Sequence, residues 1–201
     1  MINIFNVLDA NKYEVKKIKN GIEIYYIENE MLYQNKFIRL IHEENREIVY
    51  LISRGNHKEI GVFQKRILAL SIIIILCYKN FERGPENSVI KREIIKASES
   101  NDIKGVLEIM ENECDDRFYE IFNFKKNTVC IIKNNNSYNV YYKSFNEDKE
   151  IVTDASLGRA FIVLLNYTKL LENYDKLYKE ISSSFGFEEN YYYTILEYYM
   201  F

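Results

Sequence analysis

The chain has 201 residues, of which 47% are hydrophobic and 15% aromatic, and this composition excludes a disordered protein because it supplies enough apolar surface for a core. The net charge of −3 is unevenly divided: residues 1–100 carry 16 basic and 13 acidic side chains, and residues 101–201 carry 11 and 17. Halves of +3 and −6 disfavour nucleic-acid binding, which needs clustered Lys and Arg, and favour a basic protein partner.

The first half predicts several strands followed by an apolar helix. Residues 1–19 fit either a short helix or a strand with a turn, and Asn20-Gly21 is a turn signal of the hairpin type. Strands are predicted at residues 21–28, 37–41, 47–53 and 59–63. Beyond residue 64, apolar side chains recur at three- and four-residue spacing, which indicates one face of a helix over 66–81. Its four consecutive isoleucines also fit a buried strand.

Two more helices are predicted before the second half begins. Gly-Pro-Glu-Asn at residues 84–87 breaks the chain, and Ser88 is placed to cap a helix over 89–98. The next helix is expected from Asp102 to Phe122. A boundary near 123–127 follows, so we predict domains at residues 1–123 and 124–201.

The second half repeats the succession of strands and helices. Strands are predicted at residues 128–132, 137–143 and 149–152. Asp154 then stands as a helix N-cap, because a carboxylate there can accept a bond from the free amide groups of the first turn. An apolar stripe from Leu157 to Leu171 marks the helix. More helix is expected at 173–183, then a break at 182–186, and a last helix from Glu188 or Glu189 to the end.

Part of the second half matches the first half at a fixed offset of 91 residues, without a gap, between 37–81 and 128–172. The identical pairs are Ile41/Ile132, Asn45/Asn136, Val49/Val140, Tyr50/Tyr141, Ser53/Ser144, Lys58/Lys149, Glu59/Glu150, Ile60/Ile151 and Ala69/Ala160. The clearer helix of the second copy predicts that 66–81 is helical too. We therefore expect an α+β protein of two similar halves, each a small antiparallel sheet covered by helices, produced by internal duplication.

Neither export nor membrane insertion is expected. The N-terminus lacks the basic region and long apolar stretch of a signal peptide. The apolar run at 67–78 is too short to span a bilayer as a helix. Cys77, Cys114 and Cys130 are far apart and odd in number, which indicates reduced, buried thiols. We expect a cytoplasmic protein with no membrane partner, and the sequence leaves its oligomeric state open.

No motif of enzyme chemistry is present in the sequence. The spacings of phosphate loops, dinucleotide-binding loops, zinc proteases and serine hydrolases are missing. The two histidines, His42 and His57, fall in predicted polar turns, where an orienting partner for acid–base work is not expected. We therefore predict no catalytic site, no metal and no cofactor.

Acidic residues and tyrosines mark two candidate partner-binding segments. Carboxylates cluster around Cys114, and a helix face that carries them suits cationic side chains of a partner better than a metal. Near the C-terminus, tyrosines alternate with carboxylates, and exposed Tyr is enriched where proteins meet. The candidate residues are Glu111, Glu113, Asp115 and Asp116 in the first segment and Tyr191, Tyr192, Glu197 and Tyr198 in the second.

One part of the second half resembles a pattern in small bacterial immunity proteins. It consists of the stretch SYNVYYK at 137–143, a polar loop, a short strand ending at Asp154 and an amphipathic helix centred on Ala160. These proteins belong to polymorphic and contact-dependent toxin systems. The first copy departs from the pattern, with IVYL at 48–51 and a more apolar helix. The resemblance implies a non-catalytic, cytoplasmic protein that neutralises a cognate toxin by tight binding, and it assigns no contact residue.

These observations predict a non-catalytic inhibitory binding protein of the immunity type, whose partner is a cognate toxin or another basic protein. Two other classes stay open. A phage-encoded inhibitor of a host defence complex has the same compositional signature, and a hydrolase would need a cleft assembled from distant residues.

Overall fold

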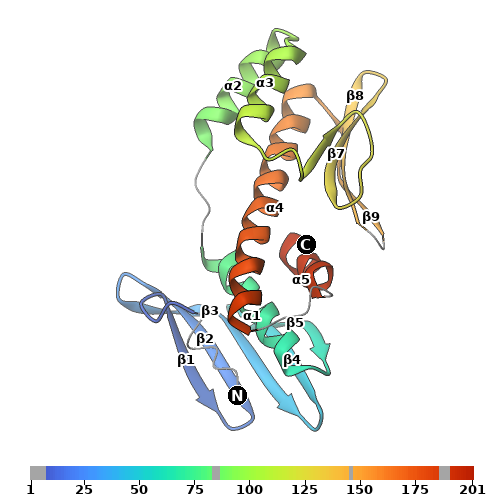
Figure 1. Ribbon diagram of the computed structural model, residues 1–201. Coiled ribbons are helices and arrows are strands. Elements are labelled where there is room, and N and C mark those ends of the chain that lie inside the picture. The colour runs from blue at the N-terminus through green and yellow to red at the C-terminus, as the bar shows by residue number, and fades with distance from the viewer. Residues whose placement is uncertain (1–7, 83–86, 145–146, 186–190) are drawn as a thin grey trace. The chain divides into compact units, whose positions relative to one another are not determined.

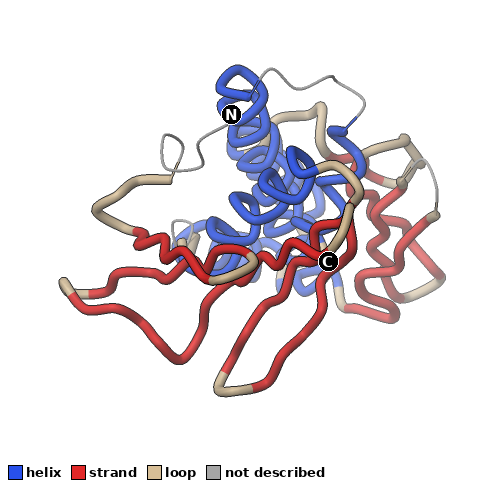
Figure 2. The backbone as a smooth tube through the Cα atoms, turned by 90° about the horizontal axis from the view of Figure 1, so that it is seen from below, coloured by secondary structure: helices blue, strands red, loops and turns tan. Residues whose placement is uncertain are grey.

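The first half of the chain forms a five-stranded antiparallel sheet with the strand order β1-β2-β3-β4-β5 (Figure 1). The computed structural model describes residues 8–82, 87–144, 147–185 and 191–201. The strands are β1 (Tyr13–Ile18), β2 (Gly21–Glu28), β3 (Met31–Glu43), β4 (Arg46–Ser53) and β5 (Asn56–Phe63). They follow one another as hairpins, and Figure 2 shows them as one layer. The described part of the opening segment is thus a turn at residues 10–12 followed by β1, as in the predicted alternative of a strand with a turn, and residues 1–7 lie outside the described residues.

Helix α1 (Arg66–Phe81) packs against β3, β4 and β5 on one side and against α5 (Tyr192–Met200) on another. Every residue from Ala69 to Cys77 is buried as a result. A helix that is apolar all round is stable only when it is covered all round, which explains the four isoleucines at 72–75. The helical prediction for 66–81 is confirmed.

The middle of the chain forms a second sheet with its own helices. Helices α2 (Ser88–Glu99) and α3 (Ile103–Glu113) pack on each other and precede the strands β6 (Tyr119–Ile121), β7 (Thr128–Asn134), β8 (Ser137–Lys143) and β9 (Asp148–Ala155). The strand order is β6-β7-β8-β9, with β6 parallel to β7 and the other pairs antiparallel. Helix α4 (Leu157–Phe185) follows β9. The expected α+β class is confirmed, although the second sheet contains a parallel pair.

The chain divides into two units whose boundaries differ from the predicted domains 1–123 and 124–201. Unit 1 consists of Met1–Gly84 and Leu177–Phe201, and unit 2 of Pro85–Lys176. The difference arises because α2 and α3 belong with the second sheet, whereas α5 returns to pack on α1. The division falls within α4.

The two units share a hairpin register at the offset of 91 residues. Phe37 lies opposite Ile52 in β3 and β4, and Thr128 lies opposite Lys143 in β7 and β8. All seven cross-strand pairs of β7 with β8 have such a counterpart. The strand-to-strand pairing that the alternating sequence predicted is therefore the same in both stretches.

Irregular features recur at the same offset. The hairpin turns place Glu44 and Asn135 at positive φ angles of 52° and 51°. The pairing of β4 with β5 has a register shift after Val49, and the pairing of β8 with β9 has one after the equivalent Val140. Helices α1 and α4 also begin at equivalent residues. The strand before the repeat differs, because β2 is antiparallel to β3 whereas β6 is parallel to β7.

The helix predicted from Asp102 to Phe122 is shorter than expected. Asp102 does cap α3, since its carboxylate accepts the Gly105 amide at 2.9 Å, but the helix ends at Glu113. Cys114 is extended, and the Asp115 carboxylate accepts the backbone N–H of Arg117, which stabilises a turn in place of helix. The chain then enters β6.

Asp154 is not an N-cap, contrary to the prediction. Strand β9 continues to Ala155, and the first helical bond of α4 runs from the Ala160 N–H to the Ser156 carbonyl. Asp154 has a positive φ of 48° within the irregular part of β9, and its carboxylate accepts the Ser137 hydroxyl. Its short polar side chain is suited to this left-handed conformation.

Other helix ends also differ from the predictions. Ser88 is the first residue of α2 and not its cap, and Asn87 precedes it without a side-chain capping bond. The break predicted at 182–186 does not interrupt α4 before Phe185. The predicted last helix starts at Tyr192 in the described part, and the predicted starts Glu188 and Glu189 lie outside the described residues.

Candidate functional site

The corner between the β3–β4 hairpin and the start of α1 contains a buried carboxylate. Glu47 is only 3% exposed, and its Oε1 accepts hydrogen bonds from Arg66 at 2.9 Å and lies 3.1 Å from Nδ1 of His42. His42 and Arg66 are largely exposed on their outer sides. Glu47 Oε2 is buried with no hydrogen-bond partner among the described residues. The Arg66 guanidinium and the contact with His42 compensate the burial of this carboxylate.

This corner has one feature of an acid–base site. A carboxylate on one ring nitrogen orients a histidine, as in the dyads of many hydrolases. In the described part of the chain, however, no Ser, Thr or Cys forms a hydrogen bond with His42. His57 is exposed, as the sequence predicted, but it lies in β5 and not in the predicted turn. The geometry therefore resembles an ion-paired corner more than a nucleophile with its base.

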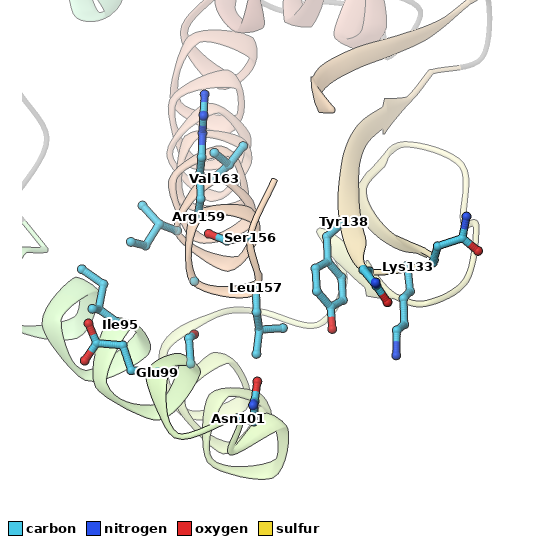
Figure 3. Close-up of a pocket in the computed structure, with 14 residues that line it drawn as sticks. Ile95, Glu99, Asn101, Lys133, Tyr138, Ser156, Leu157, Arg159 and Val163 are labelled. Carbon is cyan, nitrogen blue, oxygen red and sulfur yellow. The ribbon is translucent and has the colours of Figure 1, made fainter. Parts of the chain in front are cut away.

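The equivalent corner of unit 2 contains a pocket of about 870 Å³. The end of α2, the β7–β8 hairpin and the first turns of α4 enclose it (Figure 3). Its walls include Ile95 and Glu99 from α2, Lys133 and Tyr138 from the hairpin, and Leu157 and Arg159 from α4. The volume is in the range of sites for small ligands.

Three residues that line the pocket occupy the positions equivalent to the residues of the ion-paired corner of unit 1. At the offset of 91 residues, Lys133 replaces His42, Tyr138 replaces Glu47 and Leu157 replaces Arg66. Neither of the two Glu47 bonds of the unit 1 corner can form with these side chains. In unit 2 the corner is left open.

The first predicted partner-binding segment lies in unit 2, at the end of α3 and in the following turn. Glu111, Glu113 and Asp116 are exposed. Asp115 differs, because its carboxylate binds the Arg117 guanidinium in a two-pronged pair with contacts of 2.6 and 3.0 Å. The Asp115 backbone N–H also donates to Glu172 of α4 at 2.7 Å. Asp115 is therefore part of the turn's own structure, and the other three carboxylates face solvent.

The second predicted segment lies in unit 1 and is partly occupied by internal contacts. The Tyr192 ring meets Tyr178 edge-on at 4.9 Å, and the Tyr198 ring meets Phe63 at 5.7 Å. Lys65 donates to the Tyr191 hydroxyl at 2.7 Å. These contacts fasten the C-terminal helix to its own unit. Glu197 is half-buried beside a small cavity of unit 1.

The three cysteines are free and buried, as the sequence predicted. Burial raises the pKa of the Cys77 thiol far above its usual range and raises the pKa of Cys114 to about 12. The thiolate forms of Cys77 and Cys114 are thus scarce at neutral pH. Across the described residues, no three His, Cys, Asp or Glu side chains are grouped so that they could hold a metal ion.

The pocket and the ion-paired corner were not predicted from the sequence. The sequence predicts His42 and Lys133 in turns, which is wrong because they lie in β3 and β7, and it predicts Tyr138 in a strand, which is confirmed. The sequence contains one signal for these two sites, the 91-residue offset. It makes the first residues of β4 and β8 equivalent, and each of these strands begins after a hairpin turn and close to the helix that follows its sheet.

Comparison with known proteins gives no relative: no family model, no curated protein and no solved structure matches the chain. Among the helices of the described residues, none has both the length and the apolar character needed to cross a membrane.

Proposed function

We propose that the chain is a non-catalytic inhibitory binding protein of the immunity type, which neutralises a cognate toxin or another basic protein by direct contact. The observation that carries the proposal is the exposed acidic segment of unit 2, Glu111, Glu113 and Asp116, in the half of the chain with a charge of −6. Exposed carboxylates of one sign steer a cationic partner and raise the association rate.

The C-terminal helix supports the proposal less directly. Tyr192 and Tyr198 are half-buried, so each still offers part of its ring to a partner. Their internal contacts with Tyr178 and Phe63 hold the rings in place before binding. Rigid aromatic side chains lose little conformational entropy at an interface and make effective anchors. We therefore keep both residues as candidate anchors.

The shared register of the two units supports internal duplication as the origin of this architecture. Equivalent cross-strand pairs, turns and helix starts at one fixed offset are explained most simply by a copied strand-and-helix segment. Duplicated units with different surface residues offer one partner two different contact areas.

The proposal requires a toxin gene beside the gene of this chain, and it is tested by expressing the chain together with the toxin domain found there. The wild-type chain should restore growth. In binding kinetics with the same domain, the double substitution Glu111→Lys and Asp116→Lys should slow association about tenfold at low salt and flatten its salt dependence. Asp115 is left unchanged, because its reversal would break the pair with Arg117.

The matched control reverses two exposed carboxylates of unit 2 away from this segment, Glu93→Lys and Glu150→Lys. It changes the net charge equally and should leave the association rate near that of the wild type. Equal effects of both variants would show that net charge alone steers the partner. Failure of the wild-type chain to restore growth would contradict the immunity function.

A further inference from the structure

Two side chains that can donate hydrogen bonds line the pocket of unit 2, and neither has an acceptor among the described residues. Lys133 and Tyr138 are cross-strand partners in the β7–β8 hairpin. The Lys133 ammonium forms no ion pair, and the Tyr138 hydroxyl no hydrogen bond, with any described residue. Tyr138 is only 8% exposed as a residue, but its hydroxyl is not among the buried side-chain atoms without a partner, so the hydroxyl is open to the pocket, and Lys133 is exposed. In Figure 3 both side chains point toward the same end of the pocket.

Unit 1 provides an internal comparison for this pair. There the equivalent cross-strand positions are His42 and Glu47, and the chain itself supplies the carboxylate that His42 and Arg66 surround. Unit 2 has a cation at the first position and a hydroxyl at the second, so that no internal carboxylate is present at the hairpin pair. An anionic acceptor from a ligand could bind Lys133 and Tyr138 in place of the missing carboxylate.

The rest of the pocket is suited to an apolar body. Ile95, 41% exposed although large and apolar, stands on the α2 side, and Leu157, Ile162 and Val163 come from α4. Glu99 also lines the pocket, but Figure 3 shows it on α2, across the pocket from Lys133. A single anionic group is therefore favoured at the hairpin side and disfavoured at the α2 side.

We propose that this pocket binds a carboxylate carried on an apolar body, with the carboxylate between Lys133 and Tyr138 and the apolar part against α2 and α4. Such a ligand is either a free amphipathic carboxylic acid or the C-terminus of a polypeptide that ends in an apolar residue. This site lies outside the acidic segment and goes beyond the proposed function, so that either can fail without the other.

The test is an NMR titration of the isotope-labelled full chain with octanoate, octanol and octylamine, which differ only in the head group. Octanoate should shift the amide signals of the β7–β8 turn and of the first turn of α4, and should bind at least tenfold more tightly than octanol. A hexapeptide ending in leucine, compared with its C-terminal amide, distinguishes the two sources. Binding by either carboxylate form supports the proposal, and the stronger one identifies the source.

Two variants remove the donors one at a time. Tyr138→Phe keeps the ring, and Lys133→Met keeps much of the side-chain length. Each should weaken octanoate binding about tenfold, the equivalent of one charge-assisted hydrogen bond, and should leave octanol binding unchanged. Lys104→Met is the control, because this lysine of α3 is 87% exposed and lies outside the pocket. Retained dispersion of the spectra checks that each variant folds.

Equal binding of octanoate and octanol would overturn the proposal, because the pocket would then recognise only apolar surface. The same conclusion follows if neither carboxylate probe shifts the pocket signals, or if Tyr138→Phe and Lys133→Met bind octanoate as the wild type does.

Discussion

Glu47 and Tyr138 occupy the same position of the two hairpins, and both are buried. The two side chains differ in their hydrogen-bond partners. Glu47 has two partners, Arg66 and His42, and one oxygen without a hydrogen bond among the described residues. Tyr138 carries no charge that must be compensated, so its ring is buried at lower cost than a carboxylate would be. The same backbone position therefore supports an ion-paired corner in one unit and a pocket in the other.

At the two histidines we expect no loss of neutralising activity. His42→Ala together with His57→Ala removes the only imidazoles of the chain. A non-catalytic inhibitor should still restore growth, because Arg66 keeps Glu47 paired at 2.9 Å. The measurement is growth rescue, with circular dichroism as the check on folding. Loss of activity in a folded double variant would instead favour acid–base chemistry at the His42–Glu47 pair.

The carboxyl group of Glu23 should make the stability of the fold depend on pH in a direction that its pKa determines. Burial of this carboxyl acts to raise its pKa, but hydrogen bonds from Tyr25 and Arg39 outweigh burial, and the pKa lies below its usual value of 4.5. A lowered pKa in the folded state stabilises the protein at pH values above 4.5, and this contribution is lost as the pH falls through the folded-state pKa.

Glu23→Gln should therefore cost about 1 kcal/mol of unfolding free energy at pH 7, the typical value of one net hydrogen bond. The difference from the wild type should shrink when urea unfolding is measured at pH 3. A difference of the same size at both pH values would mean that the Glu23 charge does not contribute to stability.

At the scale of elements, α5 is fastened to unit 1 by aromatic side chains. The Tyr198 ring packs on Phe63, and its backbone carbonyl accepts a bond from Lys79. We expect Tyr198→Ala to lower the unfolding free energy by about 1–2 kcal/mol, because a half-buried ring is removed from an aromatic pair. Tyr193→Ala, at an exposed position of the same helix, should change it by less than about 0.5 kcal/mol.

Both variants are compared by thermal unfolding and by dissociation from the partner. If Tyr198→Ala speeds dissociation while its thermal midpoint stays at the wild-type value, the residue is a direct partner contact and not a fastening of α5.

Strong periodicity made some elements predictable. The alternating residues 137–143 form β8 with the predicted bounds, and the apolar stripe that begins at Leu157 forms α4. The apolar residues 66–81 have a helical spacing, but their four consecutive isoleucines also fit a buried strand because α1 is covered on several sides, and the repeat was needed to choose the helix. The exposed histidines and buried cysteines were also predicted.

Other elements were set by contacts distant in sequence. Strand β6 has three residues, too few to show a period, and exists through its parallel pairing with β7. The end of α3 depends on Glu172, which accepts the Asp115 amide from 57 positions away. The pocket is formed by α2, the β7–β8 hairpin and the start of α4 together, and a sequence pattern does not reveal how these elements meet.

At the scale of the whole molecule, the two units should lose structure independently. Val49 and Val140 are identical, equivalent and completely buried. Each Val→Ala substitution should cost about 1–2 kcal/mol by removing buried methyl groups. Native-state hydrogen exchange should place the loss in unit 1 for Val49→Ala and in unit 2 for Val140→Ala. Equal loss of protection in both units for either variant would mean that the chain unfolds as one cooperative unit.

The central claim is neutralisation by direct, non-catalytic binding, and a stoichiometric titration tests it most directly. The purified chain is added in steps to the toxin domain encoded beside it, at a toxin concentration well above the dissociation constant, and residual toxin activity is measured. Direct binding predicts a linear fall to zero at a fixed molar ratio, with no change on longer incubation. Complete inactivation by a small fraction of an equivalent, increasing with time, would contradict the claim and indicate an enzyme.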